Sequence, residues 1–345
     1  MNKVLIVAIV LSLPGVVRAA DKPKPAKVFI LVGQSNMEGK AKMSLLEYQA
    51  GQPATRDLYQ HLRKDGRWIE RDDVWIKFLE RQGKLTVGYG SPQCIGPELE
   101  FGTVVGDHYG EPVLLIKVAW GGRSLYRDFR PPSAGLPSAE VLARLLAEQQ
   151  KRQPETTLDD VRRAFGASYR AMLDEVNATL TNLKTYLPDN ADQGYELAGF
   201  IWFQGWNDMI NAEYTAEYTA NLTCFINDVR KDLKAPKLPL VIGQMGVDGA
   251  NPNANVIKFK AAQAAVMAVP EFKGNVALVK TDVFWDTEAE AVFKKGWREN
   301  IDQWNKVGSD YPYHYLGSTK TMLRIGRAFG EAVLELRGER KRDGQ

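Results

Sequence analysis

Short apolar runs alternate with longer amphipathic segments along most of this chain. Five of the runs predict buried strands, because they are short, rich in branched aliphatic residues and bounded by residues typical of turns. They cover residues 27–32, 112–119, 197–203, 238–243 and 276–279. A glycine lies at or just after the end of each of the first four runs. These glycine-marked ends are candidate positions for close backbone contacts with a ligand.

The segments between these runs predict helices over residues 98–109, 159–186, 214–233 and 318–336. In the second of them, apolar residues recur every three or four positions, as on the buried face of a helix. Alternating strands and helices predict an open parallel sheet with helices on both faces. In such sheets ligands bind beyond the carboxyl ends of the strands.

No internal repeat or strong linker interrupts this alternation, so residues 27–340 predict a single domain. Residues 126–158 are rich in Pro, Arg and Ala. They predict a loop and cap inserted before the long helix.

The beginning of the chain has the features of an export signal. A short positive start precedes a mostly apolar stretch over residues 4–17, and small residues follow at Ala19 and Ala20. We therefore predict a signal peptide over residues 1–20 and a flexible leader over residues 21–26. The apolar stretch is short for a bilayer core of roughly 30 Å, so we expect no integral membrane span and a secreted or periplasmic protein. An uncleaved anchor is the alternative.

The charge and the rare residues narrow the possible partners. The 345 residues include 45 basic and 42 acidic side chains, and no basic run suits nucleic acid. None of the three histidines lies at ligand spacing from another histidine or from a cysteine, so we expect no metal site. Cys94 and Cys224 could pair in an exported protein or remain free thiols.

The most informative motif follows the first predicted strand, where Ser35 stands between Gln34 and Asn36. A serine at this position can act as a nucleophile, with backbone N–H groups facing a developing oxyanion. The alternative is a serine that only caps a helix. A phosphate-binding loop is excluded, because the spacing from Gly33 to the following Gly-Lys pair is wrong and Ala41 stands where Ser or Thr is required.

Two further strand ends carry groups that could stabilise an oxyanion. Gly122 follows the second strand, and its backbone N–H could donate a hydrogen bond, although a Gly-Gly pair also suits a simple tight turn. Asn207 follows the third strand, and its side chain could be a further donor. A turn or helix-capping role is the alternative for Asn207.

A nucleophilic serine needs a base, and histidine suits this role because its ordinary pKa lies near 6.5. His61 adjoins a charged segment and His108 lies within a predicted helix. His314 stands in the loop before the last helix, and Asp310 precedes it by four residues. We therefore select His314 as the candidate base. A histidine satisfied by backbone contacts is the alternative.

Taken in this order, the Ser, Gly, Asn and His motifs resemble the SGNH-hydrolase superfamily. Residues 33–37 look like the nucleophile block of its sialate O-acetylesterase and acetylxylan esterase branch, and residues 95–102 are also similar to that branch. The resemblance extends over about residues 27–333. It implies a flavodoxin-like three-layer α/β/α sandwich with a parallel central sheet. It also implies hydrolysis of O-acetyl esters on sugars without a metal or an organic cofactor.

The chain departs from the family pattern at two positions. The superfamily usually places its acid three residues before the histidine, where this chain has Tyr311. The acid is then Asp310 or Asp208, or a Ser–His dyad works without one. The branch commonly has Gln-Gly-Glu in the third block, where this chain has Trp206 in place of the Glu.

We therefore expect a carbohydrate O-acetylesterase acting on an acetylated carbohydrate. A Trp ring could stack on a sugar or fill the core, and an Arg could bind an acidic glycan or a surface carboxylate. The predicted site comprises catalytic Ser35, His314 and Asp310, an oxyanion hole of Ser35, Gly122 and Asn207, and possible substrate contacts at Gln34, Gln204, Trp206 and Arg123. The alternatives are a non-catalytic glycan-binding protein on an esterase-like scaffold and a hydrolase of lipid esters or thioesters.

Overall fold

A seven-stranded sheet forms the centre of the molecule in this computed structural model, which describes residues 24–339. The predicted signal peptide lies outside the described residues. The strands follow the order β11-β10-β9-β1-β8-β5-β6, and every neighbouring pair is parallel except β5 and β6. They are β1 (Ala26–Gly33), β5 (Val74–Phe78), β6 (Arg81–Lys84), β8 (Val113–Ala119), β9 (Tyr195–Phe203), β10 (Leu240–Gln244) and β11 (Val276–Lys280).

The predicted parallel sheet is confirmed, and all five predicted runs are strands. The apolar runs did not predict β5 and β6, which form one edge of the sheet. Buried and half-buried residues alternate along β5, while β6 is mostly exposed, so neither strand has the continuous apolar run that marks the central strands. Two small antiparallel pairs lie outside the sheet: β2 (Ala41–Lys42) with β7 (Cys94–Ile95), and β3 (Arg63–Lys64) with β4 (Arg67–Trp68).

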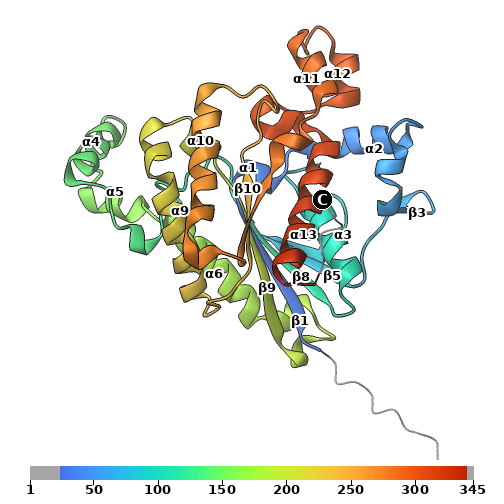
Figure 1. The fold of residues 1–345 in the computed structure, drawn as a ribbon, viewed down its shortest axis with the longest axis horizontal. Helices are drawn as coiled ribbons and strands as arrows, with labels where there is room; N and C mark the ends of the chain where they lie inside the picture. Colours follow the sequence, from blue (N-terminus) through green and yellow to red (C-terminus); the bar gives the residue numbers. More distant parts are fainter. Residues whose placement is uncertain (1–23, 340–345) are drawn as a thin grey trace, which may run out of the picture.

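Helices cover both faces of the sheet, so the fold is the expected α/β/α sandwich (Figure 1). α3 (Glu98–His108) and α13 (Thr319–Leu336) pack together on one face, while α6 (Ala167–Thr181) and α9 (Ala212–Asp232) lie on the other. The remaining helices are α1 (Ser35–Glu38), α2 (Met43–Gly51), α4 (Ala139–Gln150), α5 (Leu158–Ala164), α7 (Leu183–Tyr186), α8 (Trp206–Met209), α10 (Ala254–Ala265), α11 (Thr287–Lys294) and α12 (Ile301–Val307). The single domain over residues 27–340 stays a prediction.

The prediction of one continuous helix over residues 159–186 is wrong, because this segment is divided among α5, α6 and α7. Gly166 has a φ of 70° between α5 and α6, a left-handed conformation that breaks the helix. α5, which precedes this glycine, packs with α4 in the cap, at the left of Figure 1. A small second apolar cluster holds this cap together and includes Tyr126, Leu142, Val161 and Phe165.

The carboxyl ends of the parallel strands lie together at one edge of the molecule. In Figure 1 the chain enters β1 at the bottom, and α1, α11 and α12 lie toward the top. The residues that follow β1, β8 and β9 therefore meet at this upper edge, because these three parallel strands are neighbours. None of the helices within residues 24–339 has the length and apolar character needed to cross a membrane.

Candidate active site

Ser35 is the first residue of α1, directly after the central strand β1. Ser35 is buried, with 6% of its surface exposed, and the adjoining Gln34 and Asn36 are also buried. Neither the backbone N–H nor the hydroxyl of Ser35 donates a hydrogen bond to another described residue. The segment thus places an unpaired hydroxyl and an unpaired N–H at the sheet edge.

A buried ion pair lies beneath this segment. Lys117, in β8, has a side chain that is 0% exposed, and its Nζ lies 2.7 Å from Glu98 Oε2. The same Nζ donates to the backbone carbonyl oxygens of Glu38 and Tyr89, each at 2.8 Å. Burial lowers the pKa of Lys117, and the charge of Glu98 opposes that shift. The ammonium therefore holds the C-terminal end of α1, where helix carbonyls favour a positive charge.

Lys117 was not among the predicted site residues, although the sequence carries a signal for it. It is the one charged residue in the apolar run of β8. Its partner Glu98 lies in the segment 95–102 that carried part of the family resemblance, and Glu98 Oε1 also accepts a hydrogen bond from Gly96 N at 2.9 Å. The contacts indicate that this segment supports the serine from below.

His314 lies in the 3₁₀ segment η8 (Pro312–Gly317), and its Nδ1 is 3.0 Å from Asp310 Oδ1. Burial alone would raise the pKa of Asp310, but its hydrogen bonds with His314 and with the backbone N–H of Tyr311 hold that pKa below its usual range. Asn36 Nδ2 donates to the carbonyl oxygen of Tyr313 at 3.1 Å. This bond joins the residue after Ser35 to the residue before His314. No hydrogen bond links Ser35 Oγ to His314 among the described residues.

The backbone directly after His314 adopts an unusual conformation. Tyr315, Leu316 and Gly317 have φ values of 53°, 60° and 57°. Such conformations cost about 1–3 kcal/mol at a non-glycine residue and persist where the surroundings compensate. The buried hydroxyl of Tyr315 accepts a hydrogen bond from Gly246 N at 2.9 Å and lies 2.6 Å from Thr281 Oγ1. These contacts attach the histidine loop to the ends of β10 and β11.

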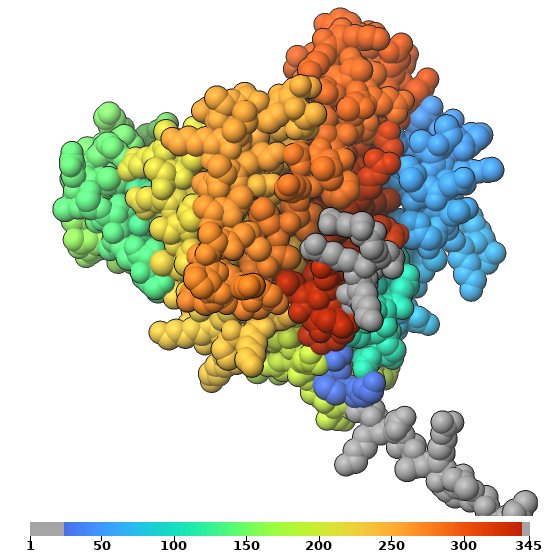
Figure 2. Space-filling model, viewed as in Figure 1, coloured from blue at the N-terminus to red at the C-terminus, as the bar shows by residue number. Residues whose placement is uncertain are grey.

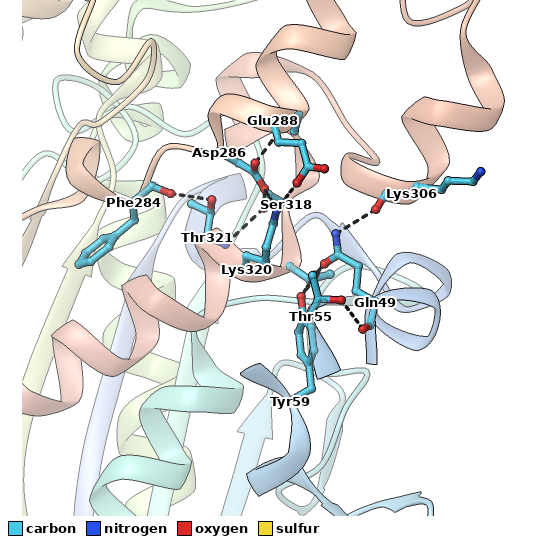
Figure 3. Close-up of polar contacts among 12 residues, drawn as sticks. Gln49, Thr55, Tyr59, Phe284, Asp286, Glu288, Lys306, Ser318, Lys320 and Thr321 are labelled. Atoms are coloured by element: carbon cyan, nitrogen blue, oxygen red, sulfur yellow. Dashed lines mark hydrogen bonds and ion pairs between the residues drawn. The ribbon is translucent and has the colours of Figure 1, made fainter. Parts of the chain in front are cut away.

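A polar network fixes the far end of the same loop, as Figure 3 shows. Ser318 caps α13 by accepting from Thr321 N, and its hydroxyl donates to Asp286 Oδ2 at 2.6 Å. Lys320 Nζ lies 3.1 Å from the same carboxylate. A second group in Figure 3 links α2 to the start of α13, because Gln49 Oε1 accepts from Thr319 Oγ1 at 2.7 Å. The loop is thus fixed by hydrogen bonds on both sides of His314.

The expected oxyanion donors lie at the ends of β8 and β9. Gly122 has a φ of 71° and is exposed, and its backbone N–H donates to no described residue. Asn207, in α8, is half-buried, and its side chain has no hydrogen-bond partner in the described part of the chain. Both groups are therefore available to a ligand.

The side chains of Gln34 and Gln204, two of the possible substrate contacts, form hydrogen bonds within the protein. Gln34 Oε1 accepts from Gly205 N at 3.0 Å and from Gln204 Nε2 at 3.2 Å. Gln204 Nε2 also donates to Asp208 Oδ2 at 2.6 Å. These bonds fix the end of β9 against the segment that carries Ser35.

Asp208 is fully buried and connects two strand ends. Its oxygens accept hydrogen bonds from the backbone N–H groups of Leu125 and Tyr126, each at 2.9 Å. Burial raises the pKa of Asp208 to about 6, and the bonds from Gln204 and these N–H groups act in the opposite direction. The Asp208 carboxylate holds the loop after β8 and has no hydrogen bond with His314.

The other two of the four possible substrate contacts, Trp206 and Arg123, have different surroundings. The half-buried Trp206 ring lies 5.4 Å, centroid to centroid, from Tyr313, beside the candidate base. Arg123 Nη1 lies 3.2 Å from Asp128 Oδ1, in a surface ion pair at the same edge. Trp202, by contrast, is wholly buried in the core.

The structure also describes the cysteines and the possible metal ligands. Cys94 and Cys224 are free thiols. Within residues 24–339 no cluster of His, Cys, Asp or Glu has an arrangement suited to a metal ion.

Several solved structures resemble this fold. A protein from Arabidopsis thaliana is 16% identical with a TM-score of 0.51, and the alignment covers 90% of this chain and 98% of that one. NanS is 14% identical with a TM-score of 0.51, and the coverage is 93% and 100%. A carbohydrate acetylesterase from Xanthomonas citri is 13% identical with a TM-score of 0.50; the alignment covers 91% of this chain but 57% of that one. At these identities the likeness concerns the fold.

The fold shared with these neighbours defines the class as an α/β/α sandwich with a mostly parallel central sheet. More specifically, the chain belongs to the family described as carbohydrate esterase, sialic acid-specific acetylesterase, which matches residues 25–291. The matched range includes Ser35, Gly122 and Asn207 and ends before Asp310 and His314. A search of curated protein sequences gave no match.

Proposed function

We propose that this protein hydrolyses acetyl esters on carbohydrate, with Ser35 as the nucleophile, His314 as the base and Asp310 as its orienting acid. Family membership supports a carbohydrate acetylesterase. The observation that carries the residue assignment is the 3.0 Å contact between His314 Nδ1 and Asp310 Oδ1, on a loop that Asn36 ties to the serine segment. Because Nδ1 faces the carboxylate, Nε2 is left to exchange a proton with the serine.

The reaction would proceed in two halves. Ser35 Oγ attacks the acetyl carbonyl carbon while His314 Nε2 takes the serine proton. The oxyanion accepts hydrogen bonds from the N–H groups of Ser35 and Gly122 and from the Asn207 side chain. The C–O bond to the sugar then breaks, and His314 gives its proton to the departing oxygen. Water attacks the acetyl-enzyme in the same manner and releases acetate.

This mechanism requires His314 Nε2 and Ser35 Oγ to come within about 3 Å in the substrate complex, since catalytic hydrogen bonds often tighten only when substrate binds. Asp310 is favoured over Asp208 because Asp208 directs its oxygens to the loop after β8. Asp208 and Gln34 then serve to position the two strand ends.

The test is acetate release from 4-nitrophenyl acetate and from a panel of O-acetylated glycans. We expect Ser35→Ala to lower kcat by three to six orders of magnitude, about the range found when a nucleophilic serine is removed. Ser44→Ala, at an exposed position in α2, is the matched control. Undiminished turnover in Ser35→Ala would overturn the assignment. A folded wild-type protein that releases no acetate but binds glycans would favour the non-catalytic alternative.

We also propose that the protein is exported, on the basis of the predicted signal over residues 1–20. Mass spectrometry of the protein expressed with its full N-terminus should find a mature chain that begins near Ala20 or Asp21. An intact Met1 in an exported sample would contradict cleavage.

A further inference from the structure

A cavity of about 310 Å³ lies beside the loop that carries the candidate base. One wall comes from the segment 309–311 and the other from α11, α12 and the turn between them. This pair of helices projects above the carboxyl edge of the sheet in Figure 1 and forms the orange-red lobe at the top of Figure 2. The residues that define its chemistry are Trp297, Ile301 and Tyr311, with Lys42, Asn305 and Asp310.

An aromatic row connects this cavity to the candidate site. It begins at Trp206, next to Asn207, and continues to Tyr313 with 5.4 Å between ring centroids. The Tyr313 ring is stacked on Tyr311 at 5.4 Å, with 8° between the planes. Tyr311 in turn meets Trp297 edge to face at 6.2 Å. The row thus passes the residue before His314 and ends in the cavity wall.

The members of this row differ in accessibility. Tyr311 is 41% exposed and Trp297 is half-buried. Trp304, in α12, is buried and packs against Trp297 and Phe293. The guanidinium of Arg298 lies 4.8 Å from the Trp297 centroid and covers one side of that ring. A ligand would therefore meet Tyr311 and the part of Trp297 that faces the cavity, while Trp304 supports the wall.

The polar atoms around the cavity complement the rings. Asn305 is exposed, and its side chain has no partner among the described residues. Lys42 and Asp310 add one charge of each sign. Apolar ring faces with a few convergent donors and acceptors suit a sugar, which has an apolar C–H face and hydroxyl groups around its rim.

We propose that this cavity binds a sugar unit next to the acetylated one, so that the substrate is an O-acetylated oligosaccharide or polysaccharide. The inference rests on the proposed function, since it places the acetylated unit at Ser35. The neighbouring unit would lie along Tyr313 and Tyr311 and enter the cavity at Trp297.

The test compares kcat/KM for an O-acetylated oligosaccharide with kcat/KM for the O-acetylated monosaccharide of the same sugar. Acetylated xylotetraose with acetylated xylose, and O-acetylated sialyllactose with O-acetylated sialic acid, provide two pairs. In at least one pair, Trp297→Ala should lower the oligosaccharide-to-monosaccharide ratio about 3- to 10-fold, as expected when one ring contact is lost. Tyr195→Ala removes an exposed aromatic ring at the opposite end of β9 and should leave the ratio unchanged.

Asn305→Ala is the second variant, because it lies on an exposed helix surface and should not disturb folding. It should lower the same ratio in the same pair. Equal kcat/KM for oligosaccharide and monosaccharide in the wild type, or an unchanged ratio in both variants, would overturn the inference.

A binding measurement separates this inference from the proposed function. Non-acetylated xylotetraose or sialyllactose should change the tryptophan fluorescence of the wild type and bind more weakly to Asn305→Ala. Such binding in a protein that releases no acetate would support the subsite and refute the esterase. Acetate release without a preference for oligosaccharides and without this binding would refute the subsite alone.

Discussion

The segment that carries Ser35 and the loop that carries His314 are held in place by different kinds of interaction. Beneath the serine lies the Lys117–Glu98 pair, in which both side chains are 0% exposed. The His314–Asp310 pair has side chains that are 16% and 24% exposed and lies on a loop rather than in the sheet. One half of the site is built into the core, and the other half is attached to its edge.

Because of this difference, we expect changes in one half of the site to affect stability first and changes in the other half to affect catalysis first. Removing one member of a buried ion pair leaves an uncompensated charge in the core, so changes beneath Ser35 should first affect folding. The histidine loop has a left-handed backbone at Tyr315 and Leu316 and depends on a few hydrogen bonds. Changes there should first affect the geometry of the base, because a small displacement of a catalytic group costs much activity.

After the loss of Ser35 itself, the largest expected effect is on the histidine side. Asp310→Asn should lower kcat by about two to four orders of magnitude, because the amide no longer stabilises the charged imidazole or selects its tautomer. Steady-state kinetics on 4-nitrophenyl acetate measures the change, and thermal melting should show a much smaller loss. Asp302→Asn, at an exposed position in α12, is the control for the change of charge. Normal kcat in Asp310→Asn would point to a dyad without Asp310.

The next effect tests the serine side. Lys117→Met should lower the free energy of unfolding by about 3–5 kcal/mol, since Glu98 would remain charged in the core without its partner. The double variant Lys117→Met/Glu98→Leu should recover part of this loss. Urea unfolding measures both. A single variant as stable as the wild type would show that the buried pair is not what fixes α1.

Asp208 gives the serine side a pH dependence of stability opposite in sign to that of Asp310, whose pKa is lowered rather than raised. Its pKa in the folded protein is about 6, above its ordinary value of 3.8, so its contribution to stability is fully present below about pH 4 and is lost as the pH rises through 6. The shift corresponds to about 3 kcal/mol between pH 4 and pH 7. Urea unfolding of wild type and Asp208→Asn across this range should show stability curves that converge or cross as the pH rises. Parallel curves would refute the raised pKa.

The smallest effect concerns the anchor of the histidine loop. Tyr315→Phe removes the acceptor for Gly246 N and the contact with Thr281, and it should cost about 1–3 kcal/mol of stability. A loop released at this point should also lower kcat more than it changes KM. Tyr48→Phe is a suitable control, because its hydroxyl has no hydrogen bond with a described residue. Equal kinetics in both variants would show that Tyr315 supports the fold alone.

The sequence predicted the parts of the site that depend on local pattern. The apolar runs and their terminal glycines identified the central strands, and Ser35, Gly122 and Asn207 follow directly from those strand ends. The edge strands β5 and β6 escaped because partial exposure removes the continuous apolar signal. The long helix was misjudged because its apolar pattern continues past Gly166 and Asn182, where the backbone leaves the helical conformation.

The sequence by itself thus determined the type of fold and the order of its chemical groups, because strand and helix periodicity is set by near neighbours along the chain. Only the tertiary structure placed Lys117 under Glu38, Asn36 on Tyr313 and Trp297 against Tyr311. The first two contacts depend on which strands and loops become neighbours when the chain folds, and the third depends on how α12 returns over the edge of the sheet. The tertiary structure also makes Asp310 rather than Asp208 the hydrogen-bond partner of His314, since hydrogen bonds form over about 3 Å in space whatever the spacing in sequence.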